Sequence, residues 1–159
     1  MKTGYLLLFL VLMLLTLMSP VQAQHSLFVP ISIERAVREN APEWTLIFVD
    51  VRKTTEENST NFRWKRENQE VAVFVSEHRS TEEARITPES LVTAAPRRQT
   101  KVEHVGDEAY LISPSPYGHP RFDVIFRRGK VRVSVEAASA DVAKRMAKHI
   151  ADALPDAQR

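Results

Sequence analysis

Two segments of the chain alternate between apolar and polar residues with the two-residue period of a half-buried strand. Valine occupies every second position in residues 71–75 and again in residues 131–135. A strand-like segment and a tight polar turn precede each of them, with the turns at residues 66–69 and 127–130. The pattern predicts two β-hairpins, each with its valine face packed under helices.

The two hairpins are related by an internal repeat at a spacing of 60 residues. Phe62, Val71, Val73, Val75 and Arg85 correspond without a gap to Phe122, Val131, Val133, Val135 and Arg145. Each copy has the expected order of strand, turn, strand and helix. We therefore predict a ββα unit that is used twice, over about residues 62–85 and 122–145.

Other segments predict the remaining elements. Residues 31–37 have the apolar spacing of a helix of about two turns, which Ser32 would cap and Pro42 would follow. Residues 44–51 are almost continuously apolar, which is typical of a central strand buried on both faces. Residues 101–112 are expected to be extended, with an interruption at Gly106-Asp107.

Helices are predicted after each hairpin. Ser80-Thr81-Glu82-Glu83 has the spacing of a capping box, so a helix should begin there. The last helix should start near Ser139 and stop at Pro155, with its apolar stripe at every fourth residue. Together these elements predict an α+β domain with a single, mostly antiparallel sheet of about five to seven strands and flanking helices.

The N-terminus has the pattern of a secretion signal. Lys2 is followed by an apolar run from Tyr5 to Met18, and Val21-Gln22-Ala23 carries small side chains where signal peptidase accepts them. We expect cleavage after Ala23, which leaves residues 24–159 as a single secreted or periplasmic domain. The alternative is an uncleaved anchor, but about 14 apolar residues span only roughly 21 Å of a ~30 Å hydrocarbon core.

Composition narrows the possible functions. Lys and Arg number 22 and Asp and Glu 20, and since Lys2 is the only charge in residues 1–23, the remainder carries 21 against 20. This balance does not point to nucleic acid. The chain has no cysteine and 4 glycines, which excludes thiol chemistry, disulfides and glycine-rich phosphate loops. We expect no cofactor, and no stable membrane span after signal cleavage.

The candidate binding residues lie on the second hairpin, on the sheet face away from the valines and in a proline-rich loop. They are Phe74, Ile125, Tyr117, Arg127, Arg128, Lys130 and Arg132. The four basic residues of the hairpin suit an anionic surface or an acidic partner. The alternative is an exposed hairpin edge that Lys and Arg keep soluble.

The candidate catalytic residues are His78, His104 and Asp107, none of which belongs to a recognised catalytic motif. Gly106-Asp107-Glu108 could supply an acid and a base, or it could form a turn in which glycine takes a positive φ. The histidine spacings supply no two metal ligands from one element, so we expect no metal site.

Two short motifs, residues 105–110 and 126–131, are followed by an alanine-rich terminal helix. In this they resemble the small extracellular α+β domains of bacterial lipoproteins and sensor-kinase ectodomains (LpqN-like), and more distantly PsbP-like domains. The resemblance covers Trp44 to Leu154 in element order. It implies an exported, non-enzymatic binding or accessory module, and it supplies no functional residues. This chain lacks the lipidated cysteine of the lipoproteins.

The sequence therefore predicts a non-enzymatic envelope module that binds a protein or a small ligand through the face around Phe74 and Ile125 and the loop at Tyr117. One alternative is a small secreted hydrolase or lyase that uses a site of histidine and carboxylate residues. Another is a structural partner in an envelope complex.

Overall fold

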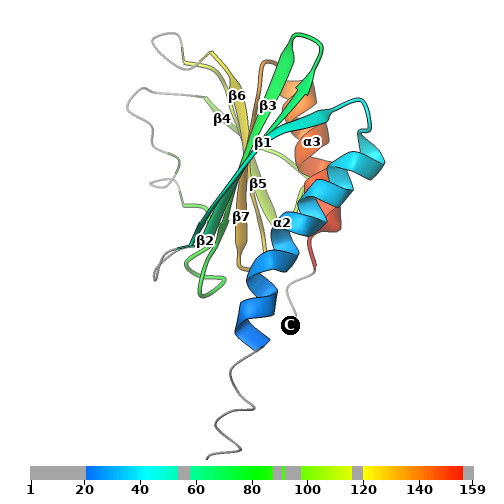
Figure 1. Ribbon diagram of the computed structural model, residues 1–159. Coiled ribbons are helices and arrows are strands. Elements are labelled where there is room, and N and C mark those ends of the chain that lie inside the picture. The colour runs from blue at the N-terminus through cyan, green and yellow to red at the C-terminus, as the bar shows by residue number, and fades with distance from the viewer. Residues whose placement is uncertain (1–20, 54–57, 88–90, 92–97, 116–119, 156–159) are drawn as a thin grey trace, which may run out of the picture.

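The computed structural model describes residues 21–53, 58–87, 91, 98–115 and 120–155. In these residues two helices cover one face of an antiparallel sheet (Figure 1). The elements in chain order are α2 (Val21–Asn40), β1 (Thr45–Lys53), β2 (Asn58–Arg66), β3 (Gln69–Glu77), β4 (Gln99–Lys101), β5 (Glu108–Ile112), β6 (Phe122–Arg128), β7 (Val131–Ala137) and α3 (Ala140–Ala153). The predicted α+β class with one antiparallel sheet is confirmed.

The sheet joins two antiparallel meanders. Its 7 strands run in the order β1-β2-β3-β7-β6-β5-β4, so β3 and β7 pair at the centre and β1 and β4 form the edges. Val71, Val73 and Val75 are buried beneath the helices, as are Val133 and Val135. The alternation of apolar and polar residues therefore marked the helix-covered face correctly.

The main core lies between this face and the two helices. Val29, Ile33 and Val37 from α2 join Met146 and Ile150 from α3 in one cluster with the sheet valines. Phe62 and Trp64 stack at 5.0 Å within the same cluster. Ser139 caps α3 by accepting a hydrogen bond from the backbone N–H of Val142, so the last helix begins where its sequence predicts.

The strand at residues 44–51 is not central. Among the described residues, β1 pairs only with β2, and its apolar residues Ile47, Phe48, Val49 and Val51 are all exposed. A continuous apolar run occurs both in a central strand that is buried on both faces and in an exposed edge strand. Periodicity alone therefore does not distinguish the two positions. Asp50 within the run and Arg52 directly after it are charges typical of an edge strand.

The predicted helix at residues 31–37 is also different. It belongs to α2, which is continuous from Val21 to Asn40 and carries Pro30 inside it, so Ser32 is an interior residue and not a cap. The end of the helix before Pro42 is as predicted. Among the described residues no helix is both long and apolar enough to cross a bilayer.

The repeat of two ββα units is not confirmed. After β3 the chain makes one turn at residues 81–84, where Glu83 donates its backbone N–H to the Ser80 hydroxyl, and residues 85–87, the next that the structure describes, are not helical. The two hairpins also differ in register: Phe62 pairs with Val73, but Phe122 pairs with Ala137. A single capping turn was enough to produce the capping-box signal.

Candidate functional site

The sheet face away from the helices is open over β1, β2 and β3. Strand alternation places Arg63 and Phe74 on this face, because their neighbours in β2 and β3 are buried. Phe48 shares the face because it pairs with Arg63. Phe48 and Phe74 are 45% and 46% exposed. We call the surface formed by Phe48, Asn61, Arg63, Ala72, Phe74, Ser134 and Glu136 the open face.

A hollow of about 180 Å³ lies in the open face. It is lined by Asn61, Arg63, Ala72, Phe74, Ser134 and Glu136. The small side chain of Ala72 makes room between the longer neighbours. The guanidinium of Arg63 lies 5.6 Å from the centre of the Phe48 ring and 4.0 Å from Glu70, so it is held beside the hollow by a cation–π contact and a charge contact.

Ile125 lies on the same side of the sheet as Phe74 but is covered. Ser134 of β7 pairs with both residues and separates them by one strand. Ile86 and Leu91, from the segment after β3, pack over Ile125, Tyr110 and Ile112 to form a second, smaller core. The face around Phe74 and Ile125 is therefore open only at its Phe74 end. Tyr117, the third residue expected here, lies outside the described residues.

Arg132 holds the covering segment in place. Its guanidinium donates hydrogen bonds to the backbone carbonyls of Glu83, Ala84 and Arg85, at 3.4 Å and 3.3 Å for the first two. Glu108 accepts a hydrogen bond from the backbone N–H of Ile86 at 3.4 Å. The guanidinium of Arg132, a candidate for partner binding, thus makes intramolecular hydrogen bonds.

The basic hairpin is partly neutralised by the loop before β5. Asp107 accepts hydrogen bonds from the Gly129 backbone N–H at 2.8 Å and from Arg127 at 3.1 Å, and its other oxygen lies 3.8 Å from Arg128. Glu108 lies 3.9 Å from the Nε of Arg127. The side chain of Lys130 is exposed at the tip of the turn.

The three catalytic candidates have separate surroundings. Asp107 fastens the β6–β7 turn, as described above. His104 is exposed in the preceding loop, where its φ of 62° is in the left-handed region. His78 follows β3, and its Nε2 lies 3.0 Å from the Ser76 hydroxyl. In the described part of the chain, no three histidine or carboxylate side chains are placed to hold a metal ion.

The surroundings of Tyr110 perturb its titration. Burial beneath the covering segment and the negative charge of Glu108 raise the pKa of Tyr110 above its usual value. Its hydroxyl also donates a hydrogen bond to Glu108 at 3.3 Å, which favours the neutral phenol.

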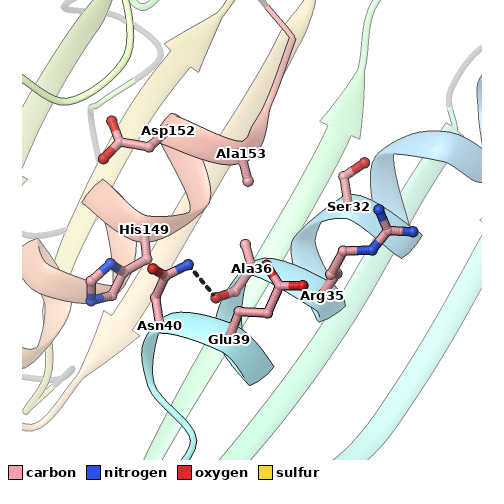
Figure 2. Close-up of a pocket in the computed structure, with 8 residues that line it drawn as sticks. All are labelled: Ser32, Arg35, Ala36, Glu39, Asn40, His149, Asp152 and Ala153. Carbon is pink, nitrogen blue, oxygen red and sulfur yellow. Dashed lines mark hydrogen bonds between the residues drawn. The ribbon is translucent and has the colours of Figure 1, made fainter.

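A separate polar groove of about 360 Å³ lies between α2 and α3. Figure 2 shows its lining residues, Ser32, Arg35, Ala36, Glu39, Asn40, His149, Asp152 and Ala153. Asn40 donates to the carbonyl of Ala36 at 2.9 Å and ties the helix end to its own backbone (Figure 2). The sequence carried no signal for this groove, because it arises from the packing of two helices that are distant in the chain.

No family model matches the chain, and comparisons with curated proteins and with solved structures likewise gave no match. The resemblance to LpqN-like and PsbP-like domains therefore stays a prediction.

Proposed function

We propose that this protein is a non-enzymatic binding module that recognises a protein partner through the open face. The observation that carries the proposal is the pair of half-exposed phenylalanines, Phe48 and Phe74, with Arg63 and a hollow between β2, β3 and β7. Aromatic rings and arginine are the residues that most often dominate binding at protein interfaces. The proposed partner places one side chain in the hollow.

The size of the hollow favours a side chain over a metabolite. Small-molecule sites usually occupy ~300–1,000 Å³ and are mainly apolar. The hollow has about 180 Å³, and Asn61, Glu136 and Arg63 supply polar groups at its rim. These groups suit the backbone of an extended partner segment, which carries both donors and acceptors.

The intramolecular hydrogen bonds of Asp107 support a non-enzymatic role. Its carboxylate already accepts hydrogen bonds from Gly129 and Arg127, so it has structural partners in place of a substrate.

We also propose that the protein works outside the cytoplasm, because residues 1–23 have the charge, apolar run and small residues of a cleaved signal. The mass of the product exported by its own host tests this directly. A mass equal to that of residues 24–159 supports the proposal, and a full-length product in the cytoplasm contradicts it.

Peptides selected from a random displayed library on the purified protein test the binding proposal. Ala72→Leu fills the hollow and Phe74→Ala removes one wall. We expect each change to weaken the selected peptides at least about tenfold, as for residues central to an interface. Ile31→Ala is the matched control, because Ile31 is also an apolar residue with about half of its surface exposed, but it lies on α2.

Three results would contradict the proposal. They are a failure to select any binder, binders that tolerate both changes, and binders as sensitive to Ile31→Ala as to Phe74→Ala. Thermal unfolding of each variant establishes that a lost affinity is not a lost fold.

A further inference from the structure

The outer edge of β1 is the second exposed apolar feature of the sheet. β1 has 9 residues and, in the part of the chain that the structure describes, pairs with β2 alone, so the backbone groups on its other side face away from the sheet. Val49 and Val51 are 43% and 46% exposed on the helix side of the strand. Edge strands are normally protected by proline, by short length or by charge. β1 has 9 residues and no proline, and its charges, Asp50, Arg52 and Lys53, include both signs, so a second copy of the strand can match them.

We propose that this edge pairs antiparallel with β1 of a second copy of the chain, about a two-fold axis at Val51. The two sheets then continue into one. This inference goes beyond the proposed function, because it concerns the strand edge and not the open face.

The charges of Asp50 and Arg52 in β1 favour the register with the axis at Val51. In an antiparallel pair about a two-fold axis, residues equally distant from the axis lie opposite each other on the same face. With the axis at Val51, Asp50 lies opposite Arg52 of the other copy, and the reverse pair forms on the other side. An axis at Asp50 would place the two Asp50 carboxylates opposite each other, and an axis at Arg52 would do the same with the two guanidinium groups.

The bulge of β1 also argues against an axis at Val49. The pairing with β2 is irregular between Leu46 and Phe48, and it is regular from Phe48 to Lys53. An axis at Val49 would require pairing through the irregular position in both copies, whereas an axis at Val51 uses the regular segment.

The ion pair already present in β1 fits the same arrangement. The Nε of Arg52 lies 2.9 Å from Asp50, and the side chain of Arg52 is 77% exposed. In the paired strands each carboxylate would lie between two guanidinium groups, its own and that of the other copy. Val51 of the two copies would meet at the axis and lose its exposure to water.

A charge exchange at the two positions tests the register. The experiment uses the full chain expressed with its own N-terminal segment, and sedimentation equilibrium measures the dimer dissociation constant. Asp50→Arg or Arg52→Asp alone places like charges opposite each other twice, so we expect each to weaken the dimer by roughly tenfold or more. The double variant, with both changes, restores opposite charges and should recover the original affinity.

Asp152→Arg is the matched control, since Asp152 is also exposed and paired with a cation, Lys148, at 2.9 Å, but lies on α3. It should leave the dimer unchanged, and so should Phe74→Ala, which separates this proposal from the binding function. The proposal is overturned if the unmodified chain is monomeric at all concentrations, if either single charge reversal leaves the dimer intact, or if the double variant is as weak as the single ones. Circular dichroism checks that each variant is folded.

Discussion

Arg132 donates a hydrogen bond to the backbone carbonyl of Ala84, a residue 48 positions earlier in the chain. The contact fastens the segment after β3 across β7, so that Ile86 and Leu91 cover one end of the sheet while Phe74 stays exposed. One arginine therefore sets the boundary between the covered and open parts of this face.

Replacing Arg132 should release the covering segment. Arg132→Ala removes hydrogen bonds to three carbonyls, and we expect the free energy of unfolding to fall by about 1–3 kcal/mol. Hydrogen exchange should accelerate in residues 84–86 more than in the valine strands. Arg132→Lys keeps the charge without the planar fork, so it should recover only part of the loss. Unchanged exchange in this segment would refute the role given to Arg132.

Gly106 has a backbone conformation that other residues cannot adopt cheaply. Its φ is +59°, and an added Cβ would come within 3.0 Å of the Phe126 ring and closer still to the carbonyl oxygen of Arg127. Gly106→Ala should therefore destabilise the protein by about 2 kcal/mol or more, because strain and a steric clash act together. Chemical denaturation measures the change, and a loss below about 0.5 kcal/mol would contradict the geometry.

Replacing His104, in the same loop, should not destabilise the protein. Its φ of 62° is unfavourable for a side chain with a Cβ, and its ring is exposed. His104→Gly should leave the free energy of unfolding unchanged or raise it by up to about 1 kcal/mol. A clear destabilisation would show that the imidazole makes contacts that offset the strained backbone.

Asp107 should matter through two separate partners. Asp107→Ala loses the acceptor for the Gly129 N–H and the charge facing Arg127. We expect about 1–3 kcal/mol of destabilisation, since a donor in a half-buried turn is left unpaired. Asp107→Asn keeps an oxygen for Gly129 and should cost less. Equal losses for the two variants would mean that the charge, not the hydrogen bond, is what stabilises the turn.

The fold was largely predictable because its strands obey a two-residue period and its last helix a four-residue one. The valines of β3 and β7, the cap at Ser139 and the end of α3 all follow from local rules. The position of β1 was not predictable in this way. Whether an apolar strand is central or at an edge depends on which strands pair with it, and that is a long-range property of the chain.

The candidate site shows the same limit. Phe74 was placed on the correct face by alternation, but Phe48 was missed because β1 was assigned to the interior. The sequence makes Arg132 a candidate for binding and Asp107 a candidate for catalysis, since it cannot show that their partners are the backbone of residues 83–85 and of Gly129. Their roles depend on contacts between segments that are distant in the chain.

Tyr110 should make the stability of the protein depend on alkaline pH. In the fold, burial and Glu108 raise the pKa of Tyr110, whereas in the unfolded chain the phenol titrates near its usual value of about 10. As pH rises through that value, the unfolded state loses its proton first and is stabilised relative to the folded state. The contribution of Tyr110 is therefore fully present below about pH 10 and is lost progressively above it.

Tyr110→Phe isolates this effect, because it keeps the ring against Ile86 and Leu91 and removes only the ionisable hydroxyl. The free energy of unfolding of both proteins is measured by denaturation from about pH 8 to pH 11. The difference between them should be constant at the lower end and should shift in favour of the phenylalanine variant as pH rises. A constant difference over the whole range would mean that the hydroxyl ionises equally easily in the folded and unfolded states, which contradicts a pKa raised by burial and by Glu108.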